Sequence, residues 1–249
     1  MLELNRISAG YGKQTVLDGI SVDFEKGKLT SIIGVNGCGK STLLKAILGI
    51  LSLSSGEIFI DGENLLTMSR NEIAKKIAYL SQGKNIPDMT VEQMVLHGRF
   101  PYLSYPRRYS SHDREVAIKA METVGVAEFA HKPLYSLSGG MRQNAYIAMA
   151  LAQDTDYILL DEPTTYLDIA HQLELMRILR KLADSGKGIV TVLHNLPIAF
   201  DFSDKLTVMS NGKIIAYGTP SEICESHIVE DIFGVKIKQV QKGKYLYEY

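Results

Sequence analysis

Apolar and polar residues alternate near the start of the chain, and the pattern then changes to that of a strand followed by a helix. Val22 and Phe24 stand between polar neighbours, which is typical of a half-buried strand. A short apolar run over residues 29–33 leads into a glycine-rich loop, and residues 42–50 continue with helical spacing. The pattern therefore predicts strands and one helix that follows a glycine loop.

The middle of the chain is predicted to be mostly helical. Residues 70–76 suit a short helix and residues 77–80 a strand, and helical patterns dominate from 90 to 153. We expect residues 84–153 to form an inserted helical subdomain, because no linker of their own sets them apart as a separate domain.

One of these helices has recognisable ends. Ser110 and Asp113 have the spacing of a capping pair, and Gly125 is expected to end the helix that they begin. The preceding segment, 97–108, is rich in aromatic and basic residues and is expected to be a loop.

Strands and helices alternate again after residue 153. Residues 157–160 and 189–193 are apolar strands, and 168–183 is a helix between them. Asn211-Gly212 predicts a hairpin, and a second hairpin is expected around Lys242-Gly243. This alternation indicates an α/β fold with a largely parallel sheet that is covered by helices.

Composition narrows the possible functions. The 249 residues include 27 Lys and Arg and 28 Asp and Glu, which argues against a protein held mainly by nucleic-acid phosphates, so we expect no nucleic-acid partner. Two cysteines exclude a disulfide framework and favour a reducing, intracellular setting. The most apolar stretch, 43–53, is too short to span a bilayer, and the N-terminus lacks the pattern of a signal peptide. We expect a chain that does not itself cross a membrane.

Residues 34–41 fit the pattern G-x-x-x-x-G-K-[ST] between a predicted strand and a predicted helix. Such a loop turns backbone N–H groups and a helix N-terminus toward the phosphates of a nucleotide. The lysine neutralises phosphate charge and the serine hydroxyl ligates Mg²⁺, so the loop predicts that a nucleotide and Mg²⁺ bind here, and the family resemblance described below implies that the nucleotide is ATP. The expected nucleotide-binding residues here are Gly34, Asn36, Gly37, Cys38, Gly39, Lys40, Ser41 and Thr42. Cys38 is either a small residue tolerated in the loop or a redox-sensing thiol.

An apolar strand ends in two acids, Asp161 and Glu162. Carboxylates at the carboxyl end of a buried strand suit a place beside a phosphate loop. Asp161 is then a candidate for the Mg²⁺ shell, and Glu162 for the general base that activates water. A strand end that simply meets solvent is the alternative.

Further motifs, in order along the chain, carry a family resemblance. Residues 137–141, Leu-Ser-Gly-Gly-Met, resemble the LSGGQ signature of ABC transporter ATPases. Gln82 and His194 follow predicted strands, as the family's glutamine-loop and switch residues do. Asp168 resembles the aspartate of the loop that signals across the family's dimer, and Tyr11 resembles the aromatic residue that stacks on adenine. The resemblance covers essentially the whole chain.

The resemblance implies one ABC ATPase domain over residues 1–249. Its P-loop core would comprise 1–83 and 154–249, with a largely parallel sheet and an N-terminal antiparallel β subdomain, and 84–153 would be the inserted helical subdomain. It also implies that two copies pack head to tail. Each ATP then lies between the phosphate loop of one copy and Ser138, Gly139, Gly140 and Asp168 of the other.

The resemblance gives roles to two further residues. Gln82 is expected to bind Mg²⁺ or a water ligand and to report the γ-phosphate, and His194 to contact that phosphate. Two residues depart from the family pattern: Met141 replaces the usual glutamine, and Asn144 stands where arginine is common. We expect these two substitutions to alter the rate of ATP hydrolysis or the affinity for ATP without abolishing the ATPase function.

Residues 90–102, 148–155 and 161–172 look like those of the group that imports ferric siderophores, haem and cobalamin. This implies an ATP-hydrolysing subunit at the cytoplasmic face of the membrane, paired with polytopic permease subunits and served by an extracytoplasmic binding protein. The alternatives are another separate-subunit transporter and a soluble ATPase of iron–sulfur cluster assembly. The chelate is not encoded here, because specificity lies in the other components.

Three aromatic residues in the expected loop are candidates for contact with a membrane subunit. Phe100, Tyr102 and Tyr105 are interspersed with basic residues, and exposed aromatics favour interfaces. Local packing within the helical subdomain is the alternative for the same side chains.

Overall fold

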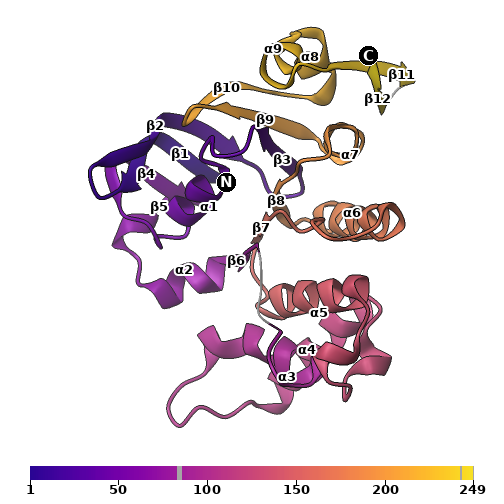
Figure 1. Cartoon of the computed structure of the whole chain (residues 1–249). Helices are drawn as coiled ribbons and strands as arrows, with labels where there is room; N and C mark the ends of the chain where they lie inside the picture. The colour runs from indigo at the N-terminus through magenta and orange to yellow at the C-terminus, as the bar shows by residue number, and fades with distance from the viewer. Residues whose placement is uncertain (83–85, 242, 249) are drawn as a thin grey trace. The chain divides into compact units, whose positions relative to one another are not determined.

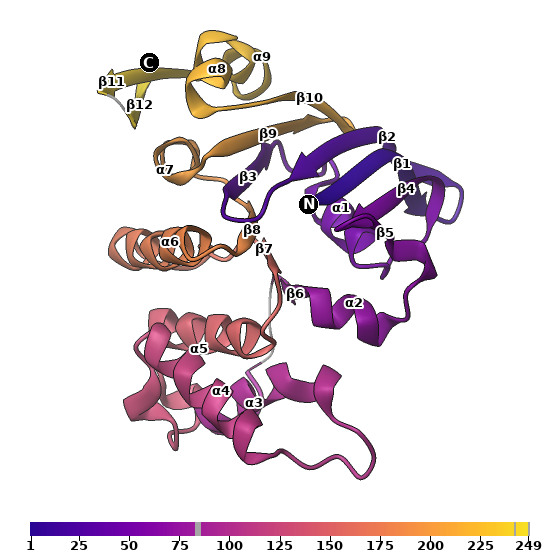
Figure 2. The ribbon, with the colours of Figure 1, turned by 180° about the vertical axis from the view of Figure 1, so that it is seen from behind.

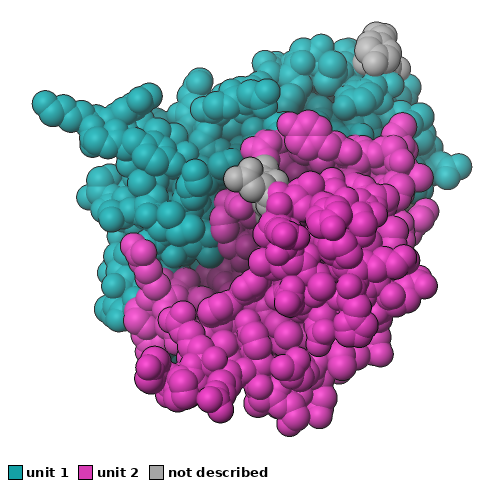
Figure 3. Space-filling model, turned by 60° about the horizontal axis from the view of Figure 1, so that its bottom comes forward, with its two compact units in different colours: residues 1–68, 179–249 teal, residues 69–178 magenta. Residues whose placement is uncertain are grey.

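The computed structural model describes residues 1–82, 86–241 and 243–248 (Figure 1). The chain divides into two compact units, coloured separately in Figure 3. Residues 1–68 and 179–249 form the first, here called the β-rich unit, and residues 69–178 form the second, here called the helical unit. The expected subdomain boundary between 83 and 84 and the expected turn residue Lys242 lie outside the described residues.

The N-terminal sheet of the β-rich unit is antiparallel, as expected. Its strands have the order β2-β1-β4-β5, and Leu2 of β1 pairs with Phe24 on one side and with Ile60 on the other. Alternation along β1 turns Leu2, Leu4 and Ile7 into the core, where all three are fully buried. The strands are β1 (Leu2–Tyr11), β2 (Gln14–Phe24), β4 (Leu53–Ile60) and β5 (Glu63–Asn64).

The second sheet of this unit is built around one buried strand. Every residue of β3 is buried, and β3 pairs in parallel with β8 and with β9. The neighbouring β10 runs antiparallel to β9 through the turn at Asn211 (φ 47°) and Gly212 (φ 75°), and positive φ at both positions is the type I′ geometry expected for an Asn-Gly hairpin. The strands are β3 (Leu29–Gly34), β8 (Gly188–Val192), β9 (Lys205–Ser210) and β10 (Lys213–Gly218).

Short helices and the terminal hairpin complete the β-rich unit (Figure 2). The expected hairpin is confirmed: β11 and β12 pair antiparallel. Tyr245 of β12 is buried, its ring lies 5.1 Å from that of Phe200 in α7, and its backbone N–H donates to Asp201 Oδ1 at 2.8 Å. The elements are α1 (Lys40–Ile47), η1 (Leu65–Thr67), α7 (Leu196–Phe202), α8 (Pro220–Glu225), α9 (Ile228–Phe233), β11 (Lys236–Gln241) and β12 (Lys244–Glu248).

The helical unit combines a parallel strand pair with several capped helices. β6 and β7 run parallel. The capping boxes at Ser69, Thr90 and Ser110 start α2, α3 and α4, and Gly125, with φ 73°, follows the end of α4 as expected. The elements are α2 (Arg70–Lys76), β6 (Ile77–Leu80), α3 (Val91–Leu96), η2 (His97–Tyr102), α4 (Ser111–Thr123), η3 (Ala127–Phe129), η4 (Leu134–Ser136), α5 (Gly139–Ala152) and β7 (Tyr157–Asp161). The helix α6 (Ile169–Asp184) begins in this unit.

Helix lengths and hydropathy bear on the membrane question. None of the helices formed by the described residues is long and apolar enough to span a bilayer.

The prediction of a loop over residues 97–108 is wrong for the first half of this segment. Residues 97–102 form a 3₁₀ helix, and its Arg99 is buried. The Arg99 guanidinium donates to Asp113 Oδ1 and to the carbonyl of Ala152, both at 2.9 Å, and lies 3.9 Å from the centre of the Tyr102 ring. These contacts come from residues far along the chain, so the local pattern does not reveal them.

Replacing Asp113 by asparagine is expected to lower the free energy of unfolding of the helical unit by about 2–4 kcal/mol, because the Arg99 charge stays buried without its counter-charge. Burial opposes ionisation of Asp113, but hydrogen bonds from Ser110 and Arg99 outweigh it and lower its pKa from 3.8 to about 2. The ionised carboxylate therefore stabilises the fold above about pH 4, and that contribution is lost as the pH falls toward about 2.

Urea unfolding followed by circular dichroism at a series of pH values measures this contribution. The stability difference between the wild type and Asp113→Asn should shrink as the pH falls from about 5 to about 2. Glu115→Gln, an exposed position on the same helix, is the matched control and should differ little from the wild type. A difference for Asp113→Asn that stays constant over this pH range would contradict the assignment.

Candidate functional site

The phosphate loop joins β3 to α1 in the β-rich unit. Val35, Asn36 and Gly37 are exposed at its outer side. Gly37 (φ 77°) and Gly39 (φ 107°) both have a left-handed backbone, which glycine adopts without strain. A Cβ at Gly37 would meet no atom within 4 Å, so the loop opens toward space that a ligand can fill. Helix α1 starts at residue 40, two residues earlier than the apolar pattern predicts.

The hairpin between β9 and β10 holds this loop from behind. A Cβ at Gly34 would lie 2.4 Å from the carbonyl oxygen of Met209, so only glycine fits there. The backbone N–H of Gly212 donates to the carbonyl of Cys38 at 3.0 Å. The loop is therefore a fixed part of the sheet edge, which suits the binding of a ligand without reorganisation.

Lys40 is buried within the loop. Its ammonium donates to the carbonyl of Gly34 at 2.8 Å and to that of Val35 at 3.0 Å. These bonds keep the positive charge at the centre of the loop, beside the first turn of α1. An anion that approaches the loop thus meets both a fixed cation and a helix N-terminus.

Cys38 lies on the inner side of the loop. Its side chain is buried, and burial raises the pKa of its thiol against the opposing effect of the Lys40 charge. A thiol that stays protonated is a weak nucleophile. This environment favours the interpretation of Cys38 as a small packed residue.

Four more expected site residues lie in the β-rich unit. Tyr11 ends β1 with half of its side chain exposed, and His194 is exposed in the bend that follows β8. Ser41 and Thr42 belong to the first turn of α1, where Ser41 is half-buried and Thr42 is buried. An exposed aromatic ring and an exposed imidazole are both accessible to a ligand.

The helical unit contains the predicted pair of acids. All residues of β7 are buried, including its last residue, Asp161, which is 4% exposed. The Tyr79 hydroxyl, from the neighbouring strand β6, donates to Asp161 Oδ2 at 3.3 Å. A carboxylate that reaches the end of a buried strand and keeps a polar partner is well placed to bind a cation.

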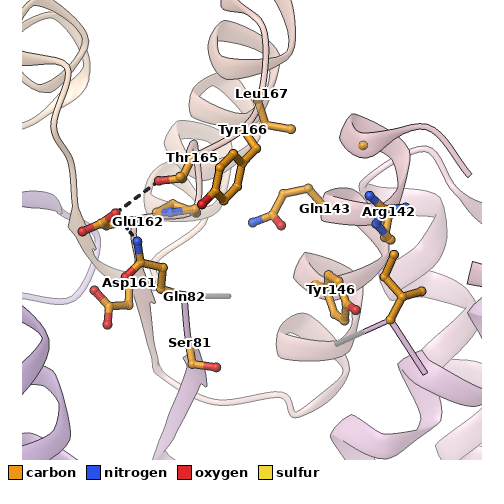
Figure 4. A pocket seen from close by; sticks show the side chains of 13 residues that line it. Ser81, Gln82, Arg142, Gln143, Tyr146, Asp161, Glu162, Thr165, Tyr166 and Leu167 are labelled. Carbon is orange, nitrogen blue, oxygen red and sulfur yellow. Dashed lines mark hydrogen bonds between the residues drawn. The ribbon is translucent and has the colours of Figure 1, made fainter. Parts of the chain in front are cut away.

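Glu162 and Gln82 are brought together, although 80 positions separate them (Figure 4). The Gln82 side-chain amide donates to Glu162 Oε2 at 2.5 Å, and the Thr165 hydroxyl donates to the same oxygen at 3.2 Å. Glu162 has a positive φ of 52°, an uncommon conformation for a residue with a side chain. Such strain is often found at functional positions.

A pocket of about 260 Å³ opens beside this cluster. Gln82, Glu162 and Tyr166 line one side of it, and Gln143 and Tyr146 of α5 line the other (Figure 4). The pocket therefore joins the acid cluster to the helix that carries the signature motif.

The signature motif opens α5, as predicted. Ser138 is the N-cap residue, and its hydroxyl accepts from the backbone N–H of Met141 at 3.3 Å. Ser138 and Gly139 are exposed, whereas Gly140 is buried. The Asn144 amide donates to the carbonyl of Val124 at 3.1 Å, so this side chain packs inside the helical unit. The contact gives a structural role to the asparagine that stands at position 144, where arginine is common in the family.

The aspartate loop, residues 166–168, is held by the first turn of α6. Asp168 Oδ1 accepts from the backbone N–H of His171 at 2.9 Å and from its ring Nδ1 at 2.8 Å, and these bonds lower the pKa of Asp168. The Gln172 amide donates to the carbonyls of Leu167 at 3.0 Å and of Thr164 at 3.3 Å. Asp168 itself remains exposed.

Sequence reasoning missed four residues of this region. Tyr79 is the polar residue of an otherwise apolar strand, and Thr165 lies three positions after Glu162, so both carried a weak local signal. His171 and Gln172 belong to the segment 161–172 that resembles the importer group, but no contact could be assigned to them from the sequence, because their contacts depend on how α6 begins.

Comparison with known proteins places this geometry in a family. The model of the family described as ABC transporter matches residues 17–165. The petrobactin import ATP-binding protein FpuD of Bacillus anthracis is 41% identical over 93% of this chain and 86% of its own length. The ferric enterobactin transport ATP-binding protein FepC of Escherichia coli is 40% identical, with the same coverage of 93% and 86%.

Solved structures agree with these relatives. A transporter assigned to the metal-chelate type, in an inward-facing conformation, matches with a TM-score of 0.85 and 27% identity over 100% of this chain and 97% of that one. The dimeric structure of the bacterial ABC transporter cassette MJ0796 matches with a TM-score of 0.76 and 27% identity over 88% of this chain and 99% of that one. The chain therefore belongs to the ABC transporter family.

Proposed function

We propose that this ABC ATPase is the ATP-hydrolysing subunit of an importer for a ferric-siderophore type of iron chelate. The observation that carries the proposal is the identity of about 40% with siderophore import proteins, which extends over 93% of the chain. A relationship that runs through both units supports the transporter role better than a role in iron–sulfur cluster assembly.

The nucleotide is assigned to the phosphate loop. Its residues fit a polyphosphate, because the loop is open at Gly37, Lys40 holds a cation at its centre, and α1 directs its N-terminus toward it. In this proposal Tyr11 stacks on the adenine, and the remaining loop residues bind the phosphates. They are Gly34, Asn36, Gly37, Cys38, Gly39, Lys40, Ser41 and Thr42.

The proposal assigns Mg²⁺ to the Ser41 hydroxyl, the Asp161 carboxylate and the Gln82 amide oxygen. These are hard oxygen donors of the kind that Mg²⁺ prefers. When bound, the ion neutralises charge on the phosphates. Ser41 and Asp161 belong to different units. The phosphate-loop motif and the acid pair at the end of β7 are therefore what supports a shared magnesium site.

Glu162 is proposed as the general base that takes a proton from the attacking water. Its carboxylate already binds the Gln82 amide and the Thr165 hydroxyl, so it is held in a defined position. Gln82 can exchange this bond for one near the γ-phosphate, and His194 is proposed to contact the same phosphate. Hydrolysis then responds to the presence of the whole nucleotide.

Two copies of the chain are proposed to pack head to tail around two ATP molecules. Ser138, Gly139 and Asp168 are exposed in the helical unit, where a second chain's nucleotide can reach them. The start of α5, with Gly140, adds a second helix N-terminus for phosphate. The dimeric structure of a related cassette supports this arrangement.

The segment 97–108, which is rich in aromatic residues, is proposed to dock to polytopic permease subunits at the cytoplasmic face of the membrane. Phe100 stacks on His97 at 5.1 Å and the Tyr102 hydroxyl donates to the carbonyl of Gln153 at 3.0 Å, so both take part in local packing. Tyr105 is 97% exposed and is the best-placed anchor for a membrane subunit. An extracytoplasmic binding protein would deliver the chelate.

Uptake of radioactive iron tests the proposal. Cells that lack this chain should lose most of their uptake of one ferric siderophore, a plasmid with the wild-type chain should restore it, and a plasmid with Glu162→Gln should not. Uptake of unchelated ferrous iron in the same cells serves as the control for general iron transport. Unchanged uptake of every ferric siderophore supplied, in cells without the chain, would contradict the importer role.

A further inference from the structure

We propose that His171 is a positioning residue. It links the aspartate loop, residues 166–168, to α5, here called the signature helix, within one chain. This inference rests on the head-to-tail dimer of the proposed function, and it concerns how one subunit presents its face to the other. All the residues involved belong to the helical unit.

One end of the link is Asp168. The carboxylate oxygen Oδ1 accepts two hydrogen bonds from the same residue, one from the backbone N–H of His171 and one from its ring Nδ1. The backbone bond is an ordinary helix cap, which many residues at 171 could supply. The ring bond depends on the imidazole, and it fixes the direction in which the exposed Asp168 carboxylate points.

The other end of the link is Gly140. A Cβ built on Gly140 would lie 2.2 Å from Cδ2 and 2.8 Å from Nε2 of the His171 ring. The ring edge opposite Nδ1 therefore lies against the backbone of the signature helix. Because the imidazole is rigid, the distance between this backbone and Asp168 is set by the width of one ring.

The two signature glycines differ in their surroundings. A Cβ at Gly139 would meet nothing within 4 Å, so Gly139 borders open space. Gly140 is buried, and the neighbour that excludes a side chain there is His171 of the same chain. The absence of a side chain at 140 thus makes room for the histidine, and a shift of the signature helix is passed through the ring to Asp168.

Variants of His171 separate the ring from its hydrogen bond. His171→Asn keeps a donor close to the position of Nδ1, whereas His171→Phe keeps a ring of similar width without a donor. Each is made in the Glu162→Gln background, where the dimer is expected to accumulate with MgATP. Analytical ultracentrifugation measures the dimer dissociation constant. The exposed His112→Phe, in α4, is the matched control.

His171→Ala, which removes both the ring and the donor, is the third variant. We expect His171→Ala and His171→Phe to raise the dimer dissociation constant about tenfold, because the Asp168 carboxylate then has to be ordered when the dimer forms instead of beforehand. His171→Asn should stay within about threefold of the parent, and His112→Phe should equal it. The affinity of the monomer for MgATP should not change in any variant, because the phosphate loop belongs to the β-rich unit. A merely structural role would instead lower the melting temperature and affect His171→Asn equally.

A double-mutant cycle tests the contact with Gly140 directly. Gly140→Ala should weaken the dimer about tenfold when His171 is present and less than threefold when residue 171 is alanine. The effect of Gly139→Ala should be the same in both backgrounds. Equal effects of Gly140→Ala in both backgrounds, or a His171→Phe chain that dimerises like its parent, would overturn the inference. A Glu162→Gln parent that stays monomeric would overturn the head-to-tail dimer itself, and the inference with it.

Discussion

Glu162→Gln is expected to lower the kcat of ATP hydrolysis at least about 100-fold, because glutamine cannot take a proton from the attacking water. The affinity for MgATP should remain within about threefold of the wild type, since the phosphate loop is untouched. The substitution is nearly isosteric, and the Gln82 amide and the Thr165 hydroxyl can still donate to the amide oxygen at position 162. With its hydrolysis blocked, the chain should accumulate as an ATP-bound dimer.

Release of phosphate from a purified chain, measured at saturating MgATP, gives kcat, and titration with a fluorescent ATP analogue gives the affinity. Glu174→Gln, an exposed glutamate on α6 of the same unit, is the control and should keep the full rate. A kcat for Glu162→Gln within about fivefold of the wild type would show that another group acts as the base.

Lys40→Ala is expected to weaken ATP binding about 100-fold or more, because the cation at the centre of the phosphate loop is removed. The wild-type ammonium is buried and bonded to the carbonyls of Gly34 and Val35, so its charge is held in a fixed position within the loop. Isothermal titration calorimetry with MgATP measures the change. Lys45→Ala, in the last turn of the same helix, is the matched control and should bind ATP as the wild type does.

Loss of the Lys40 side chain also removes two hydrogen bonds inside the loop, so the fold of the variant must be checked by circular dichroism. Adenosine, which carries no phosphate, is the second ligand to test. Its weak binding should be the same in both chains. An ATP affinity of Lys40→Ala equal to that of the wild type, with the fold intact, would contradict the assignment of the phosphate loop.

The parts of the fold that are set locally could be predicted from the sequence. Asn211-Gly212 adopts the positive φ values that its hairpin requires, and the capping box at Ser110 starts α4 where expected. The same holds for the phosphate loop, whose glycines, lysine and flanking apolar strand are neighbours along the chain. In each case the interactions that decide the structure lie within a few residues.

Contacts between distant residues could not be predicted in this way. The 3₁₀ helix at 97–102 follows from the burial of Arg99 against Asp113 and the carbonyl of Ala152, which an aromatic, basic segment does not suggest. The hydrogen bond between Gln82 and Glu162 depends on the pairing of β6 with β7, which directs both side chains to one end of the strands. Motif order indicated these residues, but not that they touch.

The contact between Gly140 and His171 illustrates a different limit. Two consecutive glycines at the start of a helix indicate that another group approaches the backbone closely, but the sequence does not identify that group. The structure assigns open space to Gly139 and a histidine ring to Gly140. The two glycines of the signature motif are therefore required for different physical reasons, Gly139 beside open space and Gly140 beside the His171 ring.

Capture of this chain from detergent-solubilised membranes of its own cells, with the captured proteins identified by mass spectrometry, tests directly whether the chain works with a membrane subunit. We expect a polytopic membrane subunit in equal amount, present with the wild type and with Glu162→Gln. The ATPase activity of that complex should rise when a chelate-loaded binding protein is added. Recovery from the soluble fraction alone, together with iron–sulfur assembly proteins, would contradict the importer and leave only the ATPase.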